Sequence, residues 1–259
     1  MVINCFGIML IMKLKHRRLI AVVVAFIGVI TWLIINPASY ESIFTRVDDN
    51  DQSVVATSDG GQADDLGDGS EGLLATDVLE KLEVKGRAPK TGYSREQFYK
   101  NWPMVDGCSL RQRIIRREFG EAAVVVDGCN VVAGEYDEPY TGQHLKYTEK
   151  TEISKGIQID HVVALSDAWQ KGAQYMEADV RYAMATDPLN LLAVDASANG
   201  KKSDGDAATW LPSNKKFRCQ YVARQVSVKY KYKLWVTEAE KEAILRVLSN
   251  CPNELAVGV

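Results

Sequence analysis

Apolar residues recur at helical spacing along much of the chain after residue 72. Leu110, Ile114, Ile115 and Phe119, for example, would share one face of a helix with 3.6 residues per turn. Thr237, three residues before Glu240, is a good N-cap and marks the start of another helix. We therefore predict helices over residues 73–82, 94–99, 110–119, 167–171, 177–185 and 237–248, and one that begins at Ser197 or Asn199.

Runs rich in β-branched and aromatic residues predict strands between these helices. Asp127-Gly128 is a turn signal between two such runs, and residues 157–165 alternate before becoming wholly apolar, as a strand that enters a core would. The predicted strands cover residues 122–126, 129–132, 157–165, 189–194 and 221–232. Together the patterns predict a helix-rich α+β domain built around a small two-stranded ribbon.

The N-terminal part of the chain has a different pattern. Residues 19–35 carry no charge and follow the basic segment 13–18, which predicts a cytoplasmic N-terminus over residues 1–18 and an exported remainder. We favour a membrane anchor at residues 19–35, with a cleaved signal peptide as the alternative. The apolar residues before the basic segment make Met12 an alternative start. Residues 36–72 are rich in Asp, Gly and Ser and predict a disordered linker, so the domain occupies residues 73–259.

The formal net charge of −3 hides a segregation of charge along the chain. Residues 47–72 carry eight acidic groups and no basic group, whereas residues 73–259 carry 26 basic and 25 acidic groups. Within that domain, residues 201–233 have nine Lys or Arg against two Asp. A polyanionic partner is therefore plausible for the C-terminal part.

Five cysteines are present, and four of them follow the apolar segment. An even number beyond an export signal indicates two disulfides in an oxidising compartment, and the absence of a Cys-x-x-Cys pair argues against a zinc knuckle. Proximity in sequence favours Cys108–Cys129 and Cys219–Cys251, although four cysteines allow three connectivities.

The polar residues at the ends of the predicted ribbon are the best candidates for catalysis. His161 suits a general base because imidazole titrates near neutrality. Asp160 and Asn199 offer the hard oxygens that Mg²⁺ prefers, and Asn190 is placed to hold the Asp-His segment by hydrogen bonds. Each has an ordinary structural reading when taken alone, because Asp-His pairs commonly end strands and Asn-Gly is a routine turn pair.

Three basic residues are candidates for contact with phosphate: Arg111, Lys201 and Lys202. For Arg111, a structural ion pair is an equally good explanation. The two lysines follow Asn199 closely, at the start of the basic segment 201–233, but by default they would be solvated surface residues.

The order of residues 160–165 (Asp-His-Val-Val-Ala-Leu), 189–192 (Leu-Asn-Leu-Leu) and 199–204 (Asn-Gly-Lys-Lys-Ser-Asp) resembles the ββα-metal finger of HNH endonucleases. Over roughly residues 87–252 the chain is similar to secreted bacterial HNH proteins related to the C-terminal domain of GmrSD restriction enzymes. The resemblance implies that His161 is the general base, Asp160 and Asn199 are metal ligands, and Asn190 is a positioning residue. Ser109 and Glu138 depart from the usual family pattern outside this set.

The sequence thus predicts an exported, membrane-tethered HNH-type nuclease that uses Mg²⁺, or alternatively Mn²⁺. DNA is the favoured substrate over RNA, and little sequence specificity is expected because no base-reading module is recognisable. Two alternatives stay open. One is a catalytically inactive surface binding or scaffold protein on the same fold, and the other is a nuclease toxin delivered to other cells.

Overall fold

The computed structural model describes residues 72–258, which belong to a compact unit over Leu66–Val259. The predicted N-terminus, membrane anchor and almost all of the predicted linker lie outside the described residues. Among residues 72–258, no helix is both long and apolar enough to cross a bilayer. The anchor at residues 19–35 therefore stays a prediction.

The strands of residues 72–258 form three small antiparallel sheets. Two of these sheets are two-stranded, β1 with β2 and β6 with β7, and the third has the order β3-β4-β5. The strands are β1 (Met104–Val105), β2 (Cys108–Ser109), β3 (Val124–Val126), β4 (Asn130–Asp137), β5 (His144–Tyr147), β6 (Ile157–His161) and β7 (Leu191–Asp195). The predicted mixture of helices and short strands is confirmed.

Helices make up most of the remaining structure. The α-helices are α3 (Ala75–Glu80), α4 (Leu110–Phe119), α5 (Lys150–Gly156), α6 (Leu165–Gln170), α7 (Ala178–Thr186), α8 (Ala196–Lys202), α9 (Arg218–Lys231) and α10 (Glu238–Leu248). Short 3-10 turns cover Arg95–Gln97, Gly120–Ala122, Ala173–Tyr175, Pro188–Asn190 and Lys215–Phe217.

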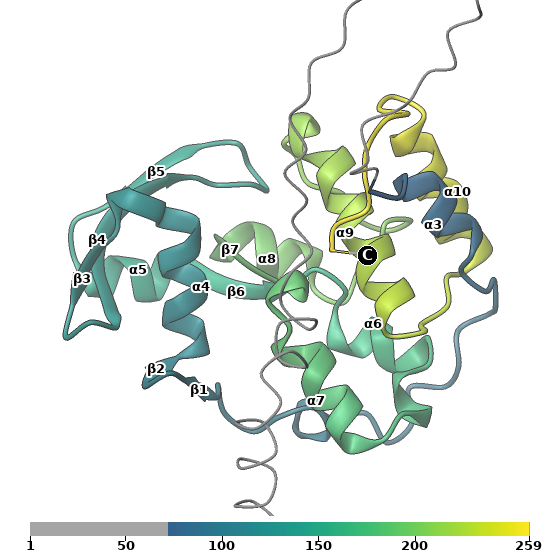
Figure 1. Ribbon diagram of the computed structural model, residues 1–259, viewed down its shortest axis with the longest axis horizontal. Coiled ribbons are helices and arrows are strands. Elements are labelled where there is room, and N and C mark those ends of the chain that lie inside the picture. Colours follow the sequence, from purple (N-terminus) through teal and green to yellow (C-terminus); the bar gives the residue numbers. More distant parts are fainter. Residues whose placement is uncertain (1–71, 259) are drawn as a thin grey trace, which may run out of the picture. The chain divides into compact units, whose positions relative to one another are not determined.

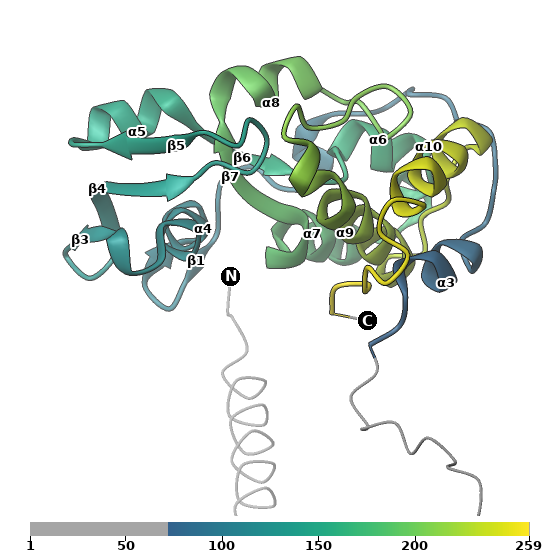
Figure 2. The same cartoon turned by 90° about the horizontal axis from the view of Figure 1, so that it is seen from above.

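The β6-β7 ribbon separates two groups of elements (Figures 1 and 2). On one side, α4 packs on the ribbon together with the β3-β4-β5 sheet, through a core that includes Ile115, Ile157 and Leu191. On the other side, α3, α9 and α10 bury a core that includes Val194 and Val226. The ribbon is thus held from both sides, and α8 follows it directly.

Several local predictions are confirmed at the level of single residues. The helix over Leu110–Phe119 is α4, and its four apolar residues are buried. The Thr237 side chain accepts a hydrogen bond from the backbone N–H of Glu240 at the start of α10. The turn at Asp127-Gly128 joins β3 to β4, with positive φ angles of 51° and 68° that Asp and Gly tolerate.

The strand predicted over residues 221–232 is wrong, because the segment is the long helix α9. Its Tyr and Val residues favour a strand by propensity alone. However, the buried residues of the helix run from Tyr221 to Lys229 with a break only at Arg224, so the helix is covered on more than one face. Burial on two sides of this helix overrides the local preference.

Other helix starts also differ from the prediction. Helix α8 begins at Ala196 with Asp195 as its cap, earlier than the predicted Ser197 or Asn199. Residues 94–99 form only a 3-10 turn over Arg95–Gln97, and the side chain of Ser94 makes no capping bond. Helix α6 begins at Leu165, and the Ser166 hydroxyl donates to Asp204 at 3.1 Å instead of capping the helix. Pattern reasoning also missed β5, whose four residues are too few to show a period.

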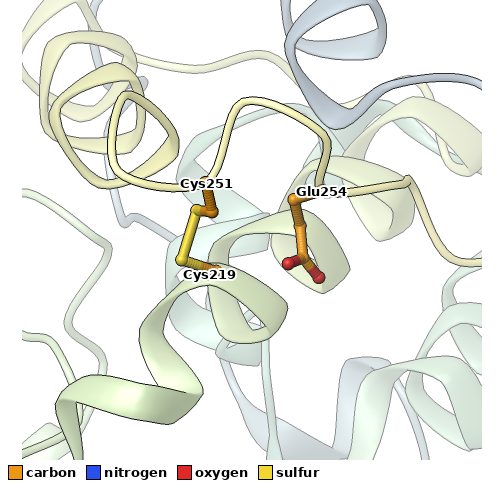
Figure 3. Close-up of side chains that lie close together, drawn as sticks. All are labelled: Cys219, Cys251 and Glu254. Atoms are coloured by element: carbon orange, nitrogen blue, oxygen red, sulfur yellow. A yellow bond between two sulfur atoms is a disulfide. The ribbon is translucent and has the colours of Figure 1, made fainter.

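Both disulfides favoured by proximity in sequence are present. Cys108–Cys129 joins β2 to the turn before β4, and Cys219–Cys251 joins α9 to the segment after α10 (Figure 3). Glu254 lies close to the second disulfide, but sulfurs bonded to each other are not thiolate ligands. This group of side chains therefore does not form a metal site.

A buried network of charges connects α6, α9, α10 and the loop after α8. Lys171 is fully buried and lies 2.7 Å from a carboxylate oxygen of each of three acidic residues: Asp167, Asp206 and Glu240. Lys229 binds Glu240 at 2.9 Å, and Arg87 reaches Asp167 and Asp206 at 2.9 and 2.6 Å. Three cations thus balance three carboxylates, which makes the burial of these charges tolerable.

Candidate active site

The candidate site lies where β6 ends. In the antiparallel register of the ribbon, Asp160 pairs with Leu192 and His161 pairs with Leu191. Successive side chains of a strand point to opposite faces, so Asp160 faces α8 with Gln158, whereas His161 faces the side of Ile157 and Ile159. The two functional groups can approach one cleft only because the strand stops at His161.

The environment of His161 fixes its tautomer. Its Nε2 lies 2.9 Å from the backbone carbonyl oxygen of Ala185. A carbonyl oxygen can only accept, so Nε2 carries the proton and Nδ1 keeps a free lone pair. The ring stacks on Trp102, with centroids 6.1 Å apart and planes 7° apart, and it also contacts Tyr99. His161 is therefore held rigidly with an unprotonated nitrogen.

Burial lowers the pKa of His161 to about 3, and the nearby Arg95 and Lys202 act in the same direction. The imidazole is therefore neutral at neutral pH, which is the form that a general base requires. Arg95 lines the same cleft as His161 and hydrogen-bonds the hydroxyl of Tyr99. An anion that entered this cleft would raise the pKa of His161 and improve it as a proton acceptor.

Asp160 is held at both carboxylate oxygens. The hydroxyl of Tyr140 donates to Oδ2 at 2.5 Å, and the ammonium of Lys202 lies 3.0 Å from Oδ1. Burial raises the pKa of Asp160, and these two donors oppose that rise. Each carboxylate oxygen keeps a second lone pair, so the group is oriented and still able to bind another ligand.

Asn199 is oriented by a neighbour on the ribbon. Helix α8 begins immediately after β7, and the Asp195 side chain caps it by accepting from the backbone N–H of Ala198. The amide nitrogen of Asn199 then donates to Oε1 of Gln158 at 2.8 Å. The nitrogen end of the Asn199 amide therefore faces Gln158, and the amide oxygen of Asn199 is left available to a ligand.

A cleft of about 330 Å³ brings the three predicted residues together. Asp160, His161 and Asn199 all line it, and Asp204 and two cationic residues, Lys90 and Arg95, lie along its edge. Asp160 and His161 are each 5% exposed, whereas Asn199 is half-buried. The site therefore combines an open entrance with a buried acidic and basic pair at its base.

The chemistry of this donor set fits a hard divalent cation. A carboxylate and an amide oxygen are ligands that Mg²⁺ accepts, and the cleft leaves room for the waters that this ion retains. The ammonium of Lys202 opposes a cation because it neutralises part of the charge on Asp160. Two oriented oxygens still suit an ion that takes few protein ligands.

Asn190 lies outside the cleft and is completely buried in the 3-10 turn before β7. Its Oδ1 accepts from the backbone N–H of Val163 at 2.8 Å, and its Nδ2 donates to the carbonyl of Met184 at 3.3 Å. Its own carbonyl accepts from the N–H of Val162 at 2.9 Å. These bonds tie the segment after His161 to β7, which supports a positioning role rather than a chemical one.

The three predicted phosphate contacts fall in three different environments. Lys201 is exposed beside the cleft and suits that role. Lys202 does not, because its ammonium is buried and binds Asp160 and the carbonyl of His161. Arg111 donates to the carbonyl of Ile157 at 3.0 Å, at the start of β6, and it does not line the cleft. Neither of these two side chains is placed to contact a phosphate at the cleft.

Sequence reasoning missed four residues that shape the site. Tyr140 and Gln158 orient the proposed ligands, and Lys90 and Arg95 supply charge at the cleft. Gln158 could have been found, because it is two residues before Asp160 and shares its face of the strand. The other three come from loops or turns distant in sequence, and no periodic pattern reports where such residues lie.

Comparison with known proteins agrees with the resemblance seen in the sequence. Residues 112–247 match the family described as GmrSD restriction endonucleases, C-terminal domain. The chain is 35% identical over 181 residues to an uncharacterized secreted protein of Arthroderma benhamiae, an alignment that covers 68% of this chain and 84% of the relative. No solved structure matches the chain.

The match to this family suggests a nuclease-like function. The chain belongs to the GmrSD C-terminal domain family. Within the matched range lie Asp160, His161, Asn190 and Asn199, so the whole proposed constellation is part of the family domain.

Proposed function

We propose that the protein is a metal-dependent HNH-type nuclease that hydrolyses phosphodiester bonds of DNA or RNA. In this proposal the β6-β7 ribbon and α8 form the ββα-metal finger. The observation that carries it is the convergence of Asp160, His161 and Asn199 on one cleft, with His161 in the tautomer of a base. Membership of a restriction endonuclease family supports the same reaction class.

His161 performs the proton transfer in this mechanism. Nδ1 takes a proton from a water molecule as the water oxygen attacks phosphorus, and the bond from phosphorus to the 3′ oxygen breaks. The departing 3′ oxygen takes a proton from a second water molecule, so the products carry a 5′ phosphate and a 3′ hydroxyl. The Nε2–H bond to Ala185 keeps the ring aligned, and it strengthens when the imidazole becomes charged.

Asp160 and Asn199 would hold one Mg²⁺ or Mn²⁺ ion. When bound, such an ion supplies positive charge to the phosphate and to the departing 3′ oxygen. Tyr140 and Lys202 keep the Asp160 carboxylate in a single orientation, and Gln158 does the same for Asn199. Asn190 fixes the backbone that follows the base.

The proposed location is outside the cytoplasm. The similar protein of Arthroderma benhamiae is described as secreted, and the two disulfides suit an oxidising compartment. The apolar segment 19–35 would act as an export signal, either as a single-pass anchor in a bacterial membrane or as a cleaved peptide.

Chelation is the first test of this function. The purified protein is expected to nick plasmid DNA in Mg²⁺ and to lose this activity in excess EDTA, with recovery when Mg²⁺ is restored. The reason is that the side-chain cations cannot take the place of the ion between Asp160 and Asn199: Lys202 is buried behind Asp160, and Lys90 and Arg95 are exposed residues of the cleft. Gel analysis of DNA and RNA substrates measures both activity and substrate preference.

The same assay separates the proposal from its rivals. A scaffold protein with an inactive site would show no degradation of DNA or RNA in any divalent cation. Degradation that is unaffected by EDTA would contradict the metal-dependent mechanism. A delivered toxin would be an active nuclease as well, so this alternative concerns biological role rather than chemistry.

A further inference from the structure

A second cavity adjoins the proposed active site. It has a volume of about 530 Å³ and shares Lys90 and Asp204 with the catalytic cleft. Its other lining residues include Lys201 and Trp210. The two cavities thus meet at a common boundary formed by residues that are far apart in sequence.

The boundary is an ion pair that can open. Lys90 lies 3.0 Å from Oδ2 of Asp204, and both side chains are about half exposed, at 51% and 50%. An exposed pair of this kind contributes at most about 1 kcal/mol, so a competing anion can displace one partner. Asp204 also accepts a hydrogen bond from Ser166 at 3.1 Å, which anchors its carboxylate. The longer side chain of Lys90 is therefore the partner that can move.

The exposed cations at this boundary suit the phosphates of a nucleic-acid backbone, and Asp204 is the one charge that opposes them. Lys90 and Lys201 are exposed cations, one on the boundary and one in the second cavity. Arg87 also lines the second cavity, but Asp167 and Asp206 already neutralise it. Asp204 is the opposing charge, since its hydrogen bonds with Lys90 and Ser166 lower its pKa and keep it ionised.

We propose that one strand of nucleic acid runs from the catalytic cleft into this second cavity, with Lys90 and Lys201 binding backbone phosphates next to the one that is cleaved. This inference rests on the proposed nuclease function and names where the strand lies. In the free protein, the ammonium of Lys90 is paired with the carboxylate of Asp204. When the strand binds, a phosphate takes the place of the carboxylate at Lys90, and Asp204 opposes binding by its negative charge.

Two substitutions on the boundary are expected to act in opposite directions. In the His161→Ala background, which prevents cleavage, Lys90→Ala should weaken the binding of a fluorescent oligonucleotide about fivefold and lower the salt slope by about 0.7–0.9. Lys201→Ala should act likewise. Asp204→Asn should tighten binding by about the same factor, because it removes a like charge and frees Lys90. Fluorescence anisotropy with single-stranded and duplex probes over a range of salt measures these changes.

Lys85→Ala is the matched control, since Lys85 forms a similarly exposed pair with Glu83 and lines neither cavity. It should leave the affinity and the salt slope unchanged. Equal effects of Lys85→Ala and Lys90→Ala would overturn the proposed path, and so would weaker binding in Asp204→Asn. Loss of Mn²⁺ binding in Asp204→Asn would instead make Asp204 a metal ligand, which also contradicts the inference.

These outcomes are separate from a failure of the proposed function. Absence of metal-dependent cleavage by the wild-type protein would refute the proposed nuclease function, whatever the binding data show. Cleavage that depends on His161, combined with unchanged binding in Lys90→Ala, would support the proposed nuclease function and reject only the proposed path of the strand.

Discussion

Replacing His161 by alanine is expected to reduce plasmid cleavage by about 10²–10⁴-fold, the usual contribution of a positioned general base. His161 lines the cleft and keeps Nδ1 unprotonated, because Nε2–H is committed to the carbonyl of Ala185. An alanine offers no proton acceptor, and Trp102 and Tyr99, which contact the ring, provide none in its place. Initial rates of nicking at saturating Mg²⁺ measure the loss.

The His161→Ala variant should still bind Mn²⁺, because the proposed ligands are Asp160 and Asn199. His144→Ala is the matched control: this histidine is exposed on β5, outside the cleft, and its loss should leave the rate unchanged. A His161→Ala protein that keeps full activity would remove the base from the mechanism. Loss of Mn²⁺ binding in the same variant would make His161 a ligand instead.

Lys171→Met is expected to lower the free energy of unfolding by about 3–5 kcal/mol, the cost of breaking a buried ion pair at one partner. Three carboxylates lie 2.7 Å from this ammonium, and only Arg87 and Lys229 would remain to balance them. The side chain is completely buried, so water cannot replace the lost charge. Urea denaturation with the disulfides intact measures the change.

Lys241→Met provides the comparison for this stability effect. Lys241 pairs with Glu80 at 2.8 Å near the surface of α10, where the partner carboxylate is 60% exposed. Its replacement should cost no more than about 1 kcal/mol. Similar losses in the two variants would contradict the view that the Lys171 network joins α6, α9 and α10 through buried charge.

The parts of the fold that could be predicted are those whose information is local. The apolar face of α4, the Thr237 cap and the Asp127-Gly128 turn depend on neighbours within one or two turns of chain. Helix α9 could not be recognised from propensity, because its Val and Tyr residues favour a strand until burial on both sides is taken into account.

The same distinction applies to the candidate site. Asp160 and His161 are the last residues of β6, Asn190 ends the turn before β7, and Asn199 lies in the helix that follows, so their order in the sequence pointed to them. The orienting contacts of Tyr140 and Lys202 on Asp160 join residues 20 and 42 positions apart, and only the fold brings them together. Lys202 shows what a sequence pattern cannot predict, since a lysine in a basic segment is normally on the surface and this one is buried.

The central claim is that the cleft at the end of β6 holds the catalytic metal ion between Asp160 and Asn199. Anomalous diffraction from a crystal of the protein soaked in Mn²⁺ tests this claim most directly. A single strong peak is expected beside the Asp160 carboxylate and the amide oxygen of Asn199, with His161 close by and not bonded to the ion. A peak at another group of side chains, or a cleft without manganese in crystals that bind it elsewhere, would contradict the proposed site.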